Sequence, residues 1–262
     1  MPLFNFQLDS LEEIRPWGRD DEPPNLHWFG LSCGHYWIDV GQQTLLEYTD
    51  AAVNDLGVHR YVDYTVDSFH GDIVDRARSI LTPVPLSLSN YMHFPRFSRW
   101  EEARARWSQS IIDATPEQDR FMDLLIWPWQ RRLDLLYLVG PPEIFIWTTE
   151  SKAYVRWQTE TQRLNGVRAW SAESGELTFT RDELIREFQD FNRRYLEAMS
   201  ERVREVSAGA LPSVSIDIDV LRRTEQDMQR MSWSQILQPD TTAEEWMEIE
   251  EAMKVVERAG LH

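Results

Sequence analysis

Residues 26–48, LHWFGLSCGHYWIDVGQQTLLEY, combine the densest aromatic run of the chain with its strongest hairpin pattern. Two strand-like segments, 26–32 and 35–40, flank the dipeptide Cys33-Gly34. A tight turn between strands favours glycine, because glycine reaches positive φ without a steric penalty. Side chains alternate between the two faces of a strand, and both faces of this stretch are apolar. It therefore predicts an aromatic β-hairpin whose faces are covered by other elements or kept for a partner.

The segments around this hairpin switch between strand-period and helix-period patterns. In the first part of the chain, strands are expected at 3–8, 44–48 and 58–65, and helices at 67–81, 100–112 and 116–125. In the second part, a helix is expected at 131–138, strands at 144–149, 153–159, 167–172 and 176–180, and a helix at 181–206. The capping box Thr180–Glu183 makes the helix at 181–206 the best defined of these elements. A further strand at 214–220 and polar helices at 221–236 and 243–259 complete the expected elements.

Each half of the chain thus shows strands followed by a helix. This order predicts an α+β fold with two antiparallel sheets backed by helices and with C-terminal helices. The shared order also suggests a degenerate β4α duplication. Gly140-Pro141-Pro142 marks the boundary between an N-terminal half, 1–140, and a C-terminal half, 141–262, with the long helix and an acidic C-terminal helix. We expect the two halves to form one compact unit.

The charge of the chain narrows the classes of partner. It has 27 basic and 44 acidic residues and a net charge of −17. Direct binding of nucleic acid needs basic patches and is therefore not expected, and anionic membrane surfaces are disfavoured for the same reason.

No run approaches the roughly 18 apolar residues of a spanning helix, and the first residues lack a secretory signal. With one cysteine and hence no internal disulfide, the chain is expected in the cytoplasm.

The hairpin contains one pattern typical of hydrolases. Gly30-Leu31-Ser32-Cys33-Gly34 matches the G-x-S-x-G nucleophile elbow, in which the serine lies between a strand and a helix. Residues 35–40 favour a strand instead of a helix, and no βα units precede them. We therefore interpret the pattern as a hairpin turn and predict no catalytic residue.

The same hairpin offers a candidate ligand pocket. His27, Ser32, His35 and Trp37 combine polar groups with aromatic walls, which keeps a small-ligand-binding or enzymatic function open as an alternative. His27, Cys33 and His35 are also metal-ligand types, but no fourth ligand stands at a known zinc spacing. We predict no metal and no cofactor.

A second metal-like pattern lies near the end of the chain. Asp217-Ile218-Asp219 resembles the D-x-D pair with which nucleotide-sugar transferases hold a divalent cation. No nucleotide-binding βαβ unit precedes it, and the alternation over 214–220 is typical of a half-buried strand. We favour the plain strand.

Several segments carry a family resemblance. They are LHWFGLSCGHYWI at 26–38, Ile14-Arg15-Pro16-Trp17-Gly18, Arg60-Tyr61-Val62-Asp63-Tyr64, Arg132-Leu133-Asp134, Tyr137-Leu138 and the helix with Phe188, Phe191, Met199 and Arg202. Together they resemble an uncharacterised bacterial family, domain of unknown function 5984, over most of the chain. The resemblance implies a bacterial cytoplasmic protein without an assigned reaction or catalytic residue.

Two acidic stretches lie beside tryptophans in the sequence. The candidate partner-binding residues are Asp20, Asp21, Glu22, Glu244, Glu245, Trp246 and Glu248. Acidic charge speeds the encounter with a basic protein, and aromatic anchors supply affinity. Together with the absence of a catalytic motif, they predict a non-catalytic interaction protein that neutralises a basic partner, as an immunity protein neutralises the nuclease domain of a secreted toxin.

Overall fold

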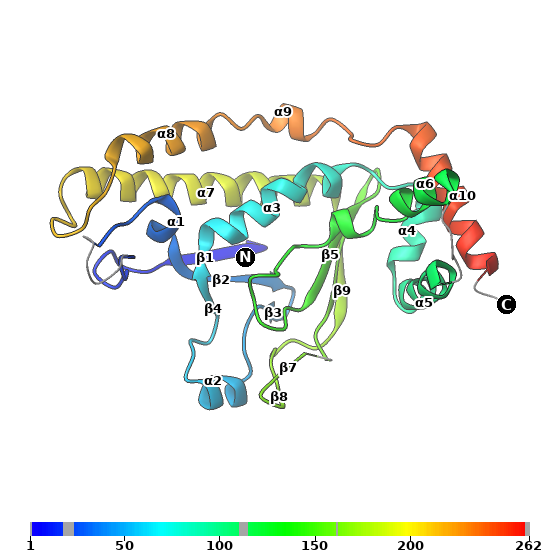
Figure 1. The fold of residues 1–262 in the computed structure, drawn as a ribbon, viewed down its shortest axis with the longest axis horizontal. Helices are drawn as coiled ribbons and strands as arrows, with labels where there is room; N and C mark the ends of the chain where they lie inside the picture. Colours follow the sequence, from blue (N-terminus) through cyan, green and yellow to red (C-terminus); the bar gives the residue numbers. More distant parts are fainter. Residues whose placement is uncertain (1, 18–23, 110–114, 161, 260–262) are drawn as a thin grey trace.

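The computed structural model describes residues 2–17, 24–109, 115–160 and 162–259 (Figure 1). Two sheets lie beneath the long helix α7 (Arg181–Ser207), and α4 (Leu86–Met92), α5 (Arg96–Gln109), α6 (Pro116–Leu124) and α10 (Ala243–Ala259) gather at one end (Figure 1). All strand pairs within the sheets are antiparallel. The predicted α+β class with antiparallel sheets and C-terminal helices is confirmed.

The first sheet is built around strand β2 (Cys33–Val40). This strand pairs with β1 (Phe4–Leu8) along one edge and with β3 (Gln43–Leu45) and β4 (Val62–Thr65) along the other. Buried and partly exposed residues alternate along β2, as a sheet with one covered face requires. The helices α2 (Asp50–Leu56) and α3 (Val66–Leu81) flank β4 in the sequence.

The aromatic hairpin predicted at 26–40 does not form. Residues Trp28–Leu31 make a short helix, α1, instead of a strand. The Trp28 indole donates a hydrogen bond to Asp67 Oδ1 (2.8 Å), and Ser32 Oγ accepts one from the backbone N–H of Asp67 (3.2 Å). These bonds to the start of α3 fix α1, and they replace the strand that the aromatic propensity favours.

Gly34 lies inside β2 and not at a turn. Its backbone pairs with Leu8 of β1, and a Cβ at this position would stand 2.3 Å from the Gln7 carbonyl oxygen. The glycine is therefore required for the close approach of β1 and not for a positive φ.

The second sheet has the order β5 (Glu143–Thr148), β6 (Lys152–Gln158) and β9 (Gly175–Thr180), which confirms the hairpin predicted across residues 150–152. A separate small pair, β7 (Arg163–Leu164) and β8 (Val167–Arg168), lies between β6 and β9 in the sequence. The last strand of each sheet runs directly into a helix, β4 into α3 and β9 into α7. The first sheet has the four strands of the predicted β4α unit, while the sheet of the second half has three.

Helix α7 connects the two sheets. Thr180 and Glu183 form the predicted capping box at its start, directly after β9. Further along, Phe188 and Phe191 pack against Phe4 of β1, with ring centroids 5.2 and 5.6 Å apart. The helix therefore covers the first sheet as well as the second.

The elements expected at 131–138, 214–220 and 221–236 also differ, and the last of these is divided between α8 (Ile218–Gln229) and α9 (Trp233–Ile236). The helix expected at 131–138 is a single 3-10 turn, η1 (Trp129–Arg131), followed by a loop. The strand expected at 214–220 gives way to helix α8, because the Asp217 side chain accepts a hydrogen bond from Val220 N (3.0 Å) and caps it. Asp217 and Asp219 are therefore a cap and a first-turn residue, not a D-x-D strand. Helix α9 precedes α10.

Two hydrophobic cores hold the chain together, and each combines residues from before and after residue 140. The larger lies between the sheets, α3 and α7, while the smaller contains tryptophans from the helical end, among them Trp100, Trp107, Trp127, Trp147 and Trp246. Within the described ranges, no helix combines the length and apolar character that a membrane span requires.

Buried arginines reinforce these cores by binding backbone carbonyls. Arg131 donates to Trp127 O (2.8 Å), Arg156 to Met92 O, and Arg202 to Leu31 O (2.6 Å). Burial lowers the pKa of both Arg131 and Arg156 to about 10. Arginine suits these positions because the planar guanidinium bonds carbonyls, and in Arg131 and Arg156 it also stacks on aromatic rings.

Candidate functional site

The four residues of the predicted ligand pocket fall into separate surroundings. Ser32 is buried, and its hydroxyl donates to Phe29 O (2.8 Å). His35 and Trp37 share one face of β2, where they stack on His59 (3.7 Å) and Tyr61 (4.5 Å). His27 lies exposed at the start of α1.

We compared five surface cavities in the part of the chain that the structure describes. None of the five is lined by any of the four pocket residues. Among the described residues, no group of three or more His, Cys, Asp and Glu side chains is arranged to hold a metal ion. In the described part of the chain, the four side chains thus share none of these five cavities and belong to no metal-binding cluster.

The predicted acidic surface on α10 is largely engaged within the fold. Glu245 caps α10 by accepting from Thr242 N (2.7 Å), and Glu248 accepts twice from Arg120 (2.7 Å each). Trp246 is only 8% exposed and packs edge-on against Trp127. Glu244 is exposed, while Asp20, Asp21 and Glu22 lie outside the described residues.

A different set of aromatic residues forms a continuous surface feature. The rings of Trp17 and His27 are 4.6 Å apart, Trp17 and Phe29 5.8 Å, Phe29 and Tyr64 6.1 Å, and Tyr64 and Tyr137 5.1 Å. We call these five residues the aromatic strip. Four separate segments supply it: the loop before α1, α1 with its cap, β4, and the loop between η1 and β5.

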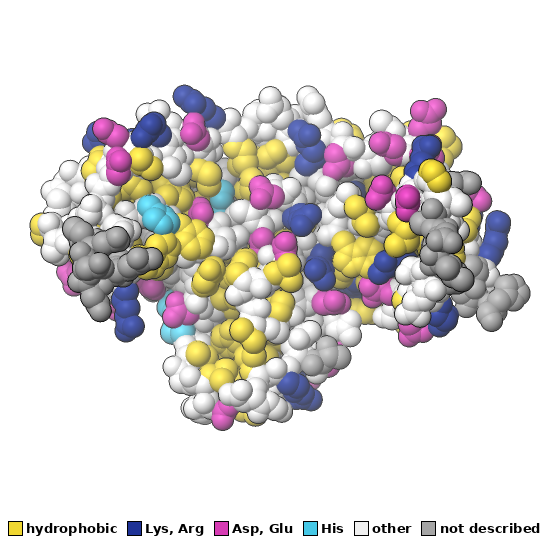
Figure 2. Space-filling model, viewed as in Figure 1, with side chains coloured by type: hydrophobic (Ala, Val, Ile, Leu, Met, Phe, Trp, Pro, Cys, Tyr) yellow, Lys and Arg dark blue, Asp and Glu magenta, His cyan; other side chains and the backbone are white. Residues whose placement is uncertain are grey.

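The aromatic strip is partly open to solvent, since Trp17, His27 and Tyr64 are exposed while Phe29 and Tyr137 are half-buried. Trp17 is 40% exposed and Tyr64 39% exposed, and the loop that carries Tyr137 also exposes Leu136 (73%) and Val139 (78%). Figure 2 shows hydrophobic side chains gathered on this face, over α1, β4 and the loop before β5. Contiguous exposed apolar surface of this kind marks interaction sites in soluble proteins.

Two carboxyl groups, those of Asp72 and Asp134, lie at the Tyr137 end of the strip. The Tyr137 hydroxyl donates to Asp72 Oδ2 (3.0 Å), and Asp134 lies 3.8 Å from Arg76. Burial, followed by the charge of Asp134, raises the pKa of Asp72 from 3.8 to about 7, against the lowering effect of the Tyr137 hydrogen bond and of Arg76. The strip therefore ends on a carboxyl group that changes charge near neutral pH.

The raised pKa of Asp72 predicts a pH-dependent cost to stability. Between about pH 4 and about pH 7, the folded state keeps a proton that the unfolded state releases, so the free energy of unfolding falls as pH rises through this window. Asp72→Asn imitates the protonated group and removes this fall. In urea denaturation, we expect the variant to match the wild type near pH 4 and to exceed it by about 1–2 kcal/mol at pH 8, allowing for solvent screening.

Asp55→Asn, at an exposed position on α2, is the control and should leave the pH slope unchanged. An Asp72→Asn variant whose stability falls with pH as steeply as that of the wild type would show that Asp72 does not carry the effect.

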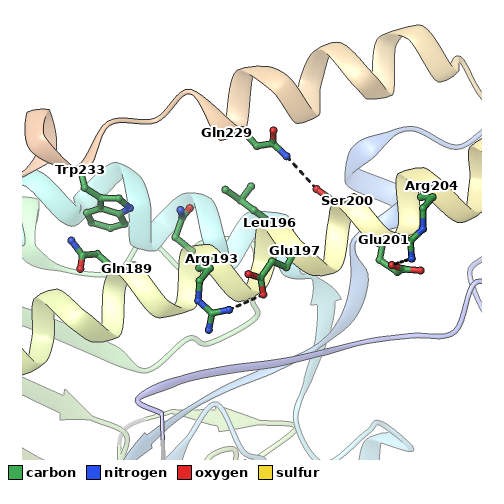
Figure 3. Close-up of a pocket in the computed structure, with 10 residues that line it drawn as sticks. Gln189, Arg193, Leu196, Glu197, Ser200, Glu201, Arg204, Gln229 and Trp233 are labelled. Carbon is green, nitrogen blue, oxygen red and sulfur yellow. Dashed lines mark hydrogen bonds and ion pairs between the residues drawn. The ribbon is translucent and has the colours of Figure 1, made fainter.

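A groove of about 570 Å³ lies between α7 and the α8–α9 segment (Figure 3). Its charged side chains pair with each other along α7, Arg193 with Glu197 (2.7 Å) and Arg204 with Glu201, and Gln229 donates to Ser200 (3.3 Å). Most of its polar groups are thus already engaged, and it offers a weaker binding surface than the aromatic strip.

Sequence reasoning missed most of the strip. It named His27 but placed it on a hairpin, and it assigned Tyr137 to a helix. The signal that was present is the run Leu135-Leu136-Tyr137-Leu138-Val139, which is too apolar for an ordinary loop and has no helical cap.

Comparison with curated proteins and with solved structures found no match for the chain. A family model described as a family of unknown function (DUF5984) matches residues 3–252. The matched range includes both sheets, α7 and every residue of the aromatic strip. The chain therefore belongs to DUF5984, a family of unknown function.

Proposed function

We propose that the aromatic strip binds a basic protein and that the chain acts without catalysis, neutralising its partner as an immunity protein does. The observation that carries this proposal is the series of ring contacts from Trp17 to Tyr137, exposed at Trp17 and Tyr64 and ending at Asp72.

Two properties of the strip support a protein partner. Trp and Tyr are the residues that most often dominate binding energy at interfaces, because they bury large areas at a small entropic cost. The strip also has backbone support, since Trp17 and Asn25 exchange two hydrogen bonds (2.9 and 2.6 Å) beside α1. Such anchors bind with little reorganisation.

Charge supports a basic partner. The chain carries a net charge of −17, and the Tyr137 end of the strip lies beside Asp72 and Asp134. Complementary charge accelerates encounter and disfavours acidic partners. The strip presents ring faces and carboxylates without a nucleophile beside a base, so the geometry favours recognition over the enzymatic alternative.

The proposal is tested by affinity purification from the source cells with three baits. The wild type should retain a basic protein that elutes as salt increases, and Trp17→Ala/Tyr64→Ala should lose it, because each anchor contributes roughly tenfold in affinity. Met247→Ala, which removes an apolar side chain that is 64% exposed on α10, is the matched control and should retain the partner.

A basic protein held equally by the wild type and the double variant would place binding elsewhere. Recovery of only acidic proteins, or of none, would contradict the proposed partner class. Matching circular dichroism spectra of the three baits separate lost binding from lost folding.

A further inference from the structure

The groove between α5 and α10 has the donor set of an anion site. It has a volume of about 560 Å³, within the range of small-ligand pockets, and it is lined by Arg96, Arg99, Trp100, Glu102, Ala103, Arg106 and Glu257. The α5 residues recur at steps of three and four, so they share one face of the helix. In a chain with a net charge of −17, three arginines on one helix face form a local concentration of positive charge.

Two donors in this groove lack acceptors. The Arg99 guanidinium is exposed and makes neither a hydrogen bond nor an ion pair within the described ranges. Trp100 is 2% exposed, and its indole N–H has no acceptor among the described residues. Buried N–H groups without acceptors are rare in folded proteins, because each loses its bond to water. The buried indole N–H therefore lacks an acceptor that a ligand could supply, while the exposed Arg99 is available to bind the same group.

The neighbouring residues favour a compact anion. Arg96 is held in place over the Tyr91 ring (3.9 Å) and beside Glu257 (3.4 Å). Ala103, Glu102 and Glu257 also line the groove, and the two carboxylates would repel an extended acidic peptide. A phosphate concentrates its charge and acceptor atoms in one group that a guanidinium binds bidentately.

We propose that the α5–α10 groove binds the phosphate group of a small phosphorylated ligand, with Arg99 and the Trp100 indole N–H as donors. The site is separate from the aromatic strip, since α5 and α10 lie at the end of the molecule away from α1 (Figure 1). A test of phosphate binding in this groove therefore gives a result that does not depend on partner binding at the aromatic strip.

The test follows the indole N–H signal of Trp100 by NMR, assigned by its loss in Trp100→Phe. Inorganic phosphate and ADP are titrated into the full chain, with sodium chloride at equal ionic strength as the reference. A saturable shift with millimolar phosphate or with ADP is expected, and Arg99→Glu should weaken it at least about tenfold. Arg230→Glu, which changes an exposed arginine directly after α8, should leave the shift unaltered.

The ADP and phosphate titrations distinguish a nucleotide ligand from free phosphate. A saturable shift with either of the two supports the proposed site. The proposal is overturned if sodium chloride produces the same shift, or if neither anion shifts the signal. It is equally overturned if Arg99→Glu binds phosphate and ADP as tightly as the wild type does. Trp100→Phe provides a second check by calorimetry, since it keeps the ring but should lower phosphate affinity.

Discussion

Replacing Gly34 with alanine is expected to lower the free energy of unfolding by more than about 3 kcal/mol. The new Cβ would stand 2.3 Å from the Gln7 carbonyl oxygen and 2.8 Å from Leu8 Cα. Both contacts are with backbone, so no side-chain rotation relieves them, and β1 must move away from β2. That movement breaks the pairing from Leu8 to Phe4, and with it the packing of Phe4 against α7.

Urea denaturation of the wild type and the variant measures this loss. Gly71→Ala is the matched control, because Gly71 lies inside α3 and a Cβ there meets no atom within 4 Å. That substitution should stabilise the fold by up to about 1 kcal/mol through helix propensity. A Gly34→Ala loss below about 1 kcal/mol would contradict the close approach of β1 and β2.

Removing the Arg202 side chain is expected to cost roughly 3 kcal/mol in the free energy of unfolding. The guanidinium donates to the carbonyls of Leu31 and Asp9, so it joins α7 to the ends of α1 and β1. Burial lowers the pKa of Arg202, yet the two carbonyls and the nearby Asp9 carboxylate favour the charged form. In Arg202→Ala, both carbonyls lose this donor in a region that water reaches poorly.

Arg202→Lys tests the geometry of this link, because an ammonium group reaches only one carbonyl well, and we expect about half of the alanine loss. Arg204→Ala, two residues further along α7, removes an exposed arginine whose partner is Glu201, and it should change stability by less than about 0.5 kcal/mol. Equal losses at positions 202 and 204 in thermal or urea unfolding would show that burial of Arg202 is unimportant.

The elements that the sequence predicted well are those with local signals. The capping boxes Thr115–Gln118 and Thr180–Glu183 begin α6 and α7, since all their hydrogen bonds lie within four residues. The β5–β6 hairpin follows from a short turn between two apolar runs.

The elements that it missed depend on distant contacts. Trp28 and Ser32 favour a strand until their bonds to Asp67 on α3 hold them in α1. Asp217 has a local role as a helix cap, but the alternating residues before it conceal this role. Trp246 has acidic neighbours in the sequence, which suggest an exposed position, yet it packs against Trp127 from another part of the chain.

The residues of the candidate site likewise depend on contacts between distant parts of the chain. Net charge and tryptophan content indicated a basic partner and aromatic anchors, both of which remain predictions. The anchors themselves come together only in three dimensions, because Phe29, Tyr64 and Tyr137 belong to α1, β4 and the loop before β5. Asp72 carries no sequence signal for its raised pKa, which arises from burial beside Asp134.

Dissociation of the purified complex tests the aromatic strip most directly. The partner recovered with the wild-type chain is immobilised, and the wild type, Met247→Ala and Trp17→Ala/Tyr64→Ala are compared by surface plasmon resonance at several salt concentrations. For the double variant, the dissociation rate should rise about a hundredfold, while association of all three chains slows equally with added salt. A double variant that dissociates at the wild-type rate would contradict binding through the strip.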